Sequence, residues 1–124
     1  MRYSDEVLTR VREPRRVGAL PAEDRNVGTG ETGTLDQGTV TRIQVRVTGK
    51  TVAEARFKVF GCSAAIASAS LVAELLEGAS LEEARQLNAN RVVRTLQLAA
   101  AREYLATMAV DAAHEAIRDW ERKK

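Results

Sequence analysis

The clearest pattern in the chain is an alternation of apolar with charged or polar side chains over residues 39–48 and 52–60. Such an alternation is typical of β-strands that bury one face and leave the other in water. A Gly-Lys pair separates the two stretches and indicates a tight turn, so the strands are expected to form a hairpin. A strict two-residue turn would pair Val45 with Glu54 and mix apolar and charged side chains on one face. We therefore expect an odd-length loop or a bulge.

The polar face of this hairpin carries four basic side chains and one acidic one. A solvated face is the usual state of such a surface in a small antiparallel sheet, and a docking surface is the alternative. The basic residues are Arg42, Arg46, Arg56 and Lys58.

Helical spacing of apolar residues dominates the rest of the chain. Ser4 and Ser80 are placed to cap two of the helices, and Glu83 completes a capping box with Ser80. The expected helices span residues 4–12, 62–76 and 80–87, then run from Asn88 or Asn90 to Leu98 and from about Ala100 to Trp120.

Strands that precede a run of helices predict an α+β fold. We expect a small antiparallel sheet, made of the 39–48/52–60 hairpin and an edge strand, with helices covering one face. Residues 17–38 are rich in Gly, Thr, Asp and Asn and predict either a loop or that weak edge strand. The length predicts a single domain over residues 1–124.

The composition excludes several classes of function. Nineteen basic and 17 acidic residues give a formal net charge of +2, and the few aromatic residues are scattered, which argues against a nucleic-acid binder. No apolar run approaches the roughly 18 residues of a membrane span. One cysteine cannot form an internal disulfide, which fits a reducing compartment, and we expect a cytoplasmic protein.

The single cysteine, Cys62, lies where the second strand ends and a helix begins. A helix N-terminus stabilises a thiolate, which would make Cys62 a nucleophile or a metal ligand. Cys62 also falls on the apolar stripe of that helix, and the spacing favours a small buried hydrophobic residue. The only histidine, His114, is expected to face water, so no Cys-His pair is predicted and we expect no enzymatic activity.

The chain resembles, nearly end to end, the U-type iron-sulfur cluster scaffold proteins (the IscU/NifU N-terminal family). Separated motifs in matching order carry the resemblance. They are Tyr3-Ser4 with Val7, Pro14-Arg15 with Val17-Gly18, Asn26-Val27-Gly28, Ala55 to Lys58, Gly61-Cys62 with Ile66-Ala67-Ser68 and Ser70-Leu71-Val72, and the later stretches GASLEEA and DAAHEAI. The resemblance implies the same α+β fold.

In that family the cluster is built on three cysteines, helped by an Asp and sometimes a His, with sulfur from a cysteine desulfurase. Of these positions only Cys62 matches here. Gln37 and Thr39 stand where the family has Cys and Asp, and Tyr104 and Leu105 stand where it has His and Cys. The chaperone recognition segment, Leu-Pro-Pro-Val-Lys in the family, is replaced by residues 98–102, whose alanines should let the last helix begin earlier.

The resemblance and its departures favour a degenerate relative that docks a cysteine desulfurase, another assembly protein or an iron-sulfur client and modulates assembly. Leu105 is expected to fill the emptied pocket, with Tyr104 beside it. The alternative is a working scaffold or an iron or sulfur carrier, in which Cys62 acts with Asp36, with Glu31 or with the Cys62 of a second subunit in a homodimer. No cofactor is firmly expected, and iron or an iron-sulfur cluster would be bound only if Cys62 is used.

Overall fold

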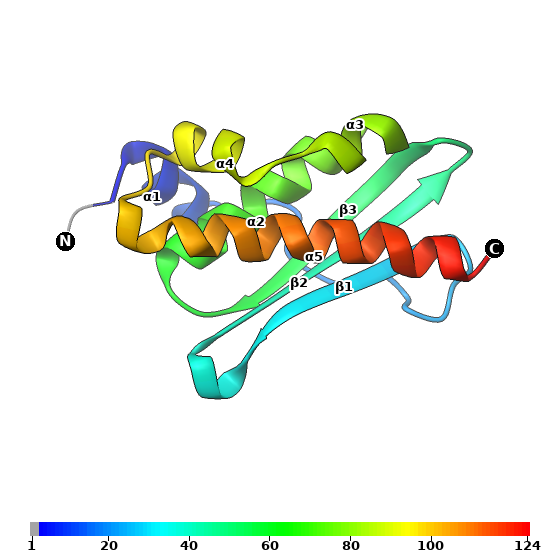
Figure 1. Ribbon diagram of the computed structural model, residues 1–124, viewed down its shortest axis with the longest axis horizontal. Helices are drawn as coiled ribbons and strands as arrows, with labels where there is room; N and C mark the ends of the chain where they lie inside the picture. Colours follow the sequence, from blue (N-terminus) through cyan, green and yellow to red (C-terminus); the bar gives the residue numbers. More distant parts are fainter. Residues whose placement is uncertain (1–2) are drawn as a thin grey trace.

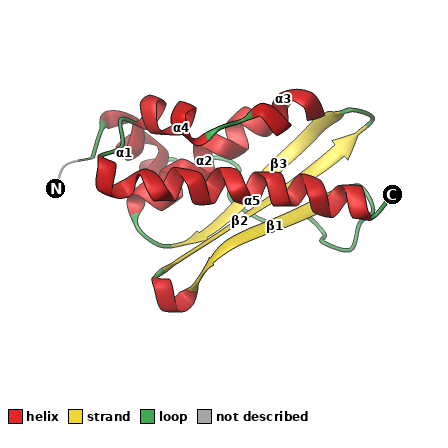
Figure 2. Cartoon of the chain, viewed as in Figure 1, coloured by secondary structure: helices red, strands yellow, loops and turns green. Residues whose placement is uncertain are grey.

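The computed structural model describes residues 3–124, in which three antiparallel strands carry all the helices on one face (Figures 1 and 2). In chain order the elements are α1 (Asp5–Arg12), β1 (Val27–Thr34), the 3₁₀ turn η1 (Leu35–Gln37), β2 (Thr39–Thr48), β3 (Thr51–Phe60), α2 (Ser63–Leu76), α3 (Leu81–Gln86), α4 (Ala89–Leu96), the 3₁₀ turn η2 (Ala100–Arg102) and α5 (Glu103–Arg122). The sheet order is β1-β2-β3. The predicted α+β fold is confirmed.

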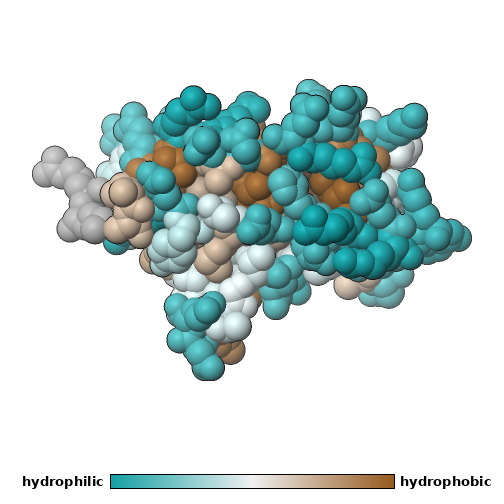
Figure 3. Space-filling view, viewed as in Figure 1, coloured by the Kyte–Doolittle hydropathy of each residue, from teal (hydrophilic) through white to brown (hydrophobic). Residues whose placement is uncertain are grey.

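The core lies between the inner face of the sheet and the helices α2 and α5, which pack directly on it. Helices α1, α3 and α4 form a further layer on α2 and α5. In Figure 3 the visible helical surface is mainly hydrophilic, and hydrophobic residues gather along the seam between α5 and the helices above it. The fully buried side chains include Val7, Ile43, Val45, Val72, Leu76, Leu96, Leu105 and Ile117.

The hairpin of β2 and β3 contains the expected bulge. Thr48 pairs with Thr51 across the two-residue turn, and the register then shifts so that Arg46 pairs with Glu54. The extra residue on β3 brings Val45 opposite Ala55, and both are completely buried. The bulge therefore keeps apolar side chains on one face, as the alternation required.

Residues 27–34 form the edge strand β1, so the strand alternative for this part of the chain is right. β1 has no apolar alternation because α5 lies directly on its glycines. A Cβ atom on Gly30 would collide with the carbonyl oxygen of Ala112, and one on Gly28 would collide with that of Ala116. Close approach of a helix backbone thus takes the place of side-chain packing along this edge.

The ends of the last two helices differ from the prediction. α4 ends at Leu96 because Gln97 adopts a left-handed conformation with φ 54°. α5 begins at Glu103, and the three residues before it form the 3₁₀ turn η2. The segment before Glu103 is therefore helical, as a 3₁₀ turn, but the α-helix itself does not extend back to Ala100.

Half of the basic outer face of the sheet is covered and paired. Arg46 contacts Asp24 at 3.0 Å and Glu54 at 2.9 Å, and Arg56 contacts Glu77 at 3.1 Å. Gln44, on the same face, is buried and makes two hydrogen bonds with the backbone of the segment that precedes β1. The prediction of a fully solvated face is therefore wrong for this half of the sheet.

Glu77 joins three segments of the chain at the end of α2. Its Oε1 accepts a hydrogen bond from Arg16 at 3.0 Å, and its Oε2 accepts from Arg56 and from the backbone N–H of Ala55, each at 3.1 Å. Burial alone would raise the pKa of the Glu77 carboxyl, but the bond from Ala55 and the guanidinium of Arg16 lower it below the ordinary value. The ionised form of Glu77 is therefore the one that fits the fold.

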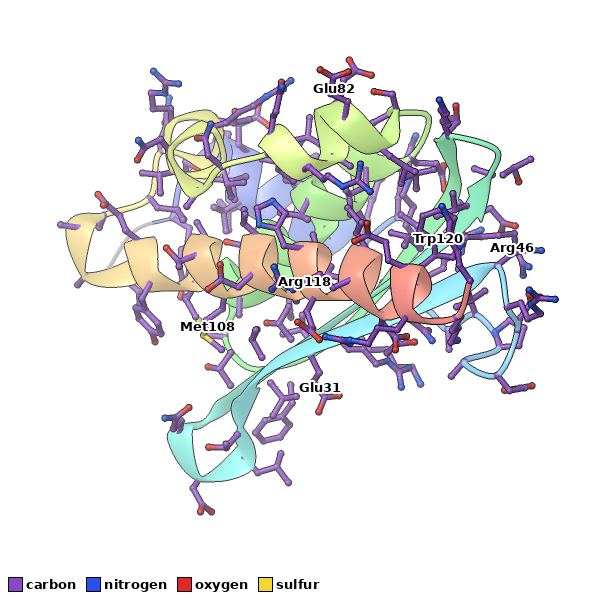
Figure 4. All side chains as sticks on the ribbon, turned by 45° about the vertical axis from the view of Figure 1, so that its right-hand side comes forward. Glu31, Arg46, Glu82, Met108, Arg118 and Trp120 are labelled. Atoms are coloured by element: carbon purple, nitrogen blue, oxygen red, sulfur yellow. The ribbon has the colours of Figure 1, made fainter. Side chains whose placement is uncertain are left out.

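Replacing Glu77 with Gln is expected to make stability less dependent on acidic pH. A pKa that is lowered in the folded state adds stability above the unfolded-state pKa, and this contribution disappears as the pH falls through the folded-state pKa. Wild-type protein should therefore lose stability on acidification, and Glu77→Gln should start lower at neutral pH and lose less. Urea unfolding at a series of pH values measures this. The matched control is Glu82→Gln, at an exposed position on α3 that Figure 4 shows pointing outward; equal slopes in all three proteins would contradict the expectation.

Candidate functional site

Cys62 is exposed to solvent at the N-cap of α2. Its backbone is extended, with φ −81° and ψ 174°, and its carbonyl accepts hydrogen bonds from the N–H groups of Ala65 and Ile66 at 3.0 and 3.1 Å. The burial that the spacing favoured is therefore wrong. An N-cap residue lies outside the helix, so its side chain does not follow the apolar stripe that begins with the next turn.

Thr39 lies against the turn that carries Cys62. A Cβ atom on Gly61 would stand 3.2 Å from Cγ2 of Thr39 and 3.3 Å from Cβ of Ala65. Thr39 itself is buried. The first residue of β2 thus occupies space directly beside the residue before the cysteine, where it offers a methyl group and a hydroxyl.

Leu105 is 1% exposed and packs with Ala64 and Ala65, which follow Cys62 on the first turn of α2. Met108 packs against the same small cluster, and Figure 4 shows its side chain on the α5 side of the β1–β2 hairpin. Tyr104, the preceding residue, is 57% exposed. The structure therefore places an aliphatic side chain inside the core beside the cysteine turn and leaves the tyrosine on the surface.

The remaining residues singled out by the sequence do not form a metal site. Asp36 and Gln37 lie exposed in η1, at the tip of the β1–β2 hairpin. Glu31 is exposed too, and in Figure 4 it points to the side of the sheet away from α5. Within residues 3–124 no three His, Cys, Asp or Glu side chains come close enough together to hold a metal ion. The carboxylates that the sequence offered as partners of Cys62 are therefore not gathered with it into a three-ligand group in the described part of the chain.

His114 does not face water as expected. It is partly buried in a small cavity bounded by Arg85, Ile117, Arg118 and Glu121, and its Nε2 atom is enclosed without a hydrogen-bond partner in the described part of the chain. The cavity lies where α3 packs against α5, so α3 covers the helix face that a single-helix projection assigned to solvent.

An apolar groove beside the Cys62 turn is the feature that sequence reasoning missed. It has a volume of about 710 Å³, and Phe60, Leu35 and Val17 on its walls are 59%, 69% and 51% exposed. Its lining comprises Val11, Pro14, Val17, Glu31, Leu35, Val40, Arg42, Phe57, Lys58, Val59, Phe60 and Ile66. The sequence held one signal for the groove. The strand alternation places the apolar residues Val40 and Phe60 on the same face as charged residues, and in the structure these two residues pair with each other.

The fold and the motifs around Cys62 define a class of protein. The chain matches the family model described as NifU-like N terminal domain over residues 2–124, and it belongs to that family. The iron-sulfur cluster assembly scaffold protein IscU of Azotobacter vinelandii is 40% identical over 125 residues, a match that covers 100% of this chain and 98% of that protein. IscU of Haemophilus influenzae is 38% identical, with 100% and 99% covered.

Solved structures share the fold at lower sequence identity. The N-terminal part of a NifU-like protein from Brucella abortus superposes with a TM-score of 0.70 at 22% identity, covering 98% of this chain and 95% of that one. A protein from Fervidobacterium islandicum described as a scaffold for the SUF system gives a TM-score of 0.69 at 15% identity, with 93% and 96% covered. This chain therefore shares its arrangement of sheet and helices with these two solved structures.

In residues 3–124 no helix has both the length and the apolar character that crossing a membrane requires.

Proposed function

We propose that this chain acts in iron-sulfur cluster assembly as a docking member of the scaffold family, which binds a cysteine desulfurase, another assembly protein or a client and modulates assembly. It does so without building a cluster on three thiolates of its own and without a catalytic step. Full-length similarity to scaffolds named IscU supports the pathway. The residues around Cys62 support the restriction on cluster building.

Iron in iron-sulfur clusters is held by thiolates, with imidazole in some centres. Here one thiol, Cys62, stands with a threonine at 39, an exposed glutamine at 37 and a buried leucine at 105. A hydroxyl, an amide and an isobutyl group are poor substitutes for soft thiolate ligands. One subunit therefore offers a cluster too few ligands to hold it.

The observation that carries the docking proposal is the apolar groove next to Cys62. Exposed apolar patches that are rimmed by polar residues mark interaction sites in proteins. The groove is lined mainly by aliphatic and aromatic side chains, and the charged residues in its described lining are Arg42, Lys58 and Glu31. Binding there would place a partner beside the exposed thiol without any metal.

Titration of the full chain with the purified cysteine desulfurase of the same organism tests this proposal. We expect binding in the micromolar range or tighter by isothermal calorimetry. The double variant Leu35→Ser/Phe60→Ser should weaken binding by about tenfold or more, because it removes two apolar anchors from the groove.

Tyr104→Ser is the matched control, since Tyr104 is as exposed as Phe60 and does not line the groove. It should bind as the wild type does. Absence of any binding to the desulfurase would remove the main support for the proposal, and equal losses in the control and the double variant would show that the groove is not the docking site.

A further inference from the structure

Strand β3 forms one edge of the sheet, and most of that edge is protected. At three residues of β3, backbone groups that point away from β2 are hydrogen-bonded to another segment of the chain. Val52 exchanges hydrogen bonds with Ala79 and Gly78 at 2.9 and 2.8 Å, Ala55 donates its N–H to Glu77 at 3.1 Å, and Phe57 exchanges two bonds of 3.0 Å with Arg16 and Gly18. Covering an edge in this way is how proteins prevent unwanted strand pairing.

Val59 is the exception at this edge. Because backbone groups alternate along a strand, its N–H and C=O point the same way as those of Phe57, two residues earlier. Neither group has a hydrogen-bond partner within residues 3–124. The open position lies three residues before Cys62, so a strand paired here would run beside the cysteine turn.

Apolar side chains surround this open position on both faces of the sheet. On the inner side the groove is bounded by Val11, Pro14 and Ile66, and on the outer side by Phe60 and Val40. The opposite edge of the sheet also lacks backbone partners near Glu31 among the described residues, but β1 reads Gly-Glu-Thr-Gly there and offers no apolar side chain. Of the two edges, the one at Val59 therefore combines unpaired backbone groups with apolar side chains that a ligand could contact.

The charged side chains beside the open edge favour a partner segment that carries acidic residues. Arg42 and Lys58 stand directly opposite each other on β2 and β3, and neither forms an ion pair in the described chain. Like charges in such a cross-strand pair are destabilising. Glu31 stands opposite Arg42 in the register of β1 and β2 without forming an ion pair within residues 3–124, and the three side chains together leave an excess of one positive charge at the groove. Arg46 and Arg56, farther along the same face, are neutralised by acidic side chains.

We infer that the open edge at Val59 binds an extended segment of a partner protein, which adds to the sheet as a further strand. The segment alternates apolar side chains, which enter the groove, with acidic ones, which face Arg42 and Lys58. Backbone pairing supplies affinity in this mode and side-chain pockets supply specificity. A helical partner would leave the groups of Val59 unpaired. The inference rests on the proposed function for the identity of the partner as an assembly protein or client.

Selection of random dodecapeptides displayed on phage against the immobilised full chain tests the inference. We expect enrichment of sequences that alternate aliphatic or aromatic residues with Asp or Glu. A selected peptide, made synthetically, should slow hydrogen exchange of the Val59 amide in the ¹⁵N-labelled protein. Enrichment of basic or helix-patterned sequences, or failure to enrich any sequence, would overturn the inference, as would binding that leaves the Val59 amide unprotected.

Two variants separate backbone pairing from charge. Val59→Pro removes the outward N–H at an edge position, where proline is tolerated, and should weaken peptide binding about tenfold or more. Arg42→Glu/Lys58→Glu should do the same. The control Arg91→Glu/Arg94→Glu makes the same charge reversal at two exposed cations of α4, away from the groove, and should leave peptide affinity within about twofold. Circular dichroism shows whether each variant folds. If Val59→Pro does not fold, the inference is tested by the affinity of the charge-reversal variant and by hydrogen exchange of the Val59 amide in the wild-type protein.

The desulfurase titration distinguishes this inference from the proposed function. If the desulfurase binds Val59→Pro and Arg42→Glu/Lys58→Glu as it binds the wild type, strand addition is wrong and docking stands. If acidic peptides protect Val59 but no assembly protein binds, the strand-binding edge stands and the proposed function fails.

Discussion

Anaerobic incubation with iron and sulfide is expected to leave the wild-type protein colourless, whereas a variant with the family's ligands restored should turn brown. The restored variant carries Gln37→Cys, Thr39→Asp, Tyr104→His and Leu105→Cys. The expectation follows from ligand number, because one thiolate leaves most coordination positions of a cluster empty and three thiolates with a carboxylate fill them. Visible charge-transfer absorbance and chemical analysis of iron and sulfide per chain are the measurements.

The structure indicates why these positions should cooperate. Thr39 lies against the residue before Cys62, and Leu105 packs beside the first turn of α2. Replacing Leu105 by cysteine removes an isobutyl group from that space and supplies a thiolate to it. Gln37 is already exposed on the hairpin tip, so the change there costs no buried contact.

Two control variants test whether the colour depends on Cys62 and on the added ligands. Cys62→Ser in the restored background should abolish most of the colour, and Leu105→Ala in the wild-type background should stay colourless, since a cavity without a ligand binds no iron. Stoichiometric iron and sulfide in the wild-type protein, lost in Cys62→Ser, would contradict the docking proposal. That outcome would favour the working scaffold in which Cys62 acts with a carboxylate or a second subunit.

Leu105→Ala is expected to lower the free energy of unfolding by about 2–5 kcal/mol, because it deletes a fully buried side chain and leaves a cavity. Urea unfolding followed by circular dichroism measures the change. The expectation applies to Leu105 as a core residue packed with Ala64 and Ala65, whatever partner the protein binds.

Tyr104→Ala is the neighbouring control. Tyr104 precedes Leu105 on α5 and is largely exposed, so truncating it should change stability by no more than about 0.5 kcal/mol. Similar losses at both positions would contradict the assignment of Leu105 as the residue that fills the space beside the cysteine turn.

Local features of the fold could be predicted because they are encoded within a few residues. The alternation over residues 39–60 predicts the hairpin and offers its bulge as one of two alternatives, and Ser80 with Glu83 predicts the capping box that the structure contains. The edge strand β1 was only one of two alternatives, because its glycines carry no periodic signal until α5 is laid against them.

The candidate site was harder to predict than the fold. The motif comparison singled out Cys62 and positions 37, 39, 104 and 105, but spacing favoured burial for Cys62 and a solvent-facing His114, and both of these expectations are wrong. A helical projection reports which residues share a side of one helix. It does not report that an N-cap lies outside that helix or that another helix covers its far side.

The sequence by itself determined the hairpin of β2 and β3, the run of helices that follows it and the family, since these depend on residue identity and short-range spacing. Only the tertiary structure decided that Leu105 is buried and Tyr104 is not, that Arg46 and Arg56 are paired while Arg42 and Lys58 are free of ion pairs within residues 3–124, and that the edge at Val59 is open. Burial and pairing depend on which distant segments come to lie against each residue, and that is set by the packing of the whole chain.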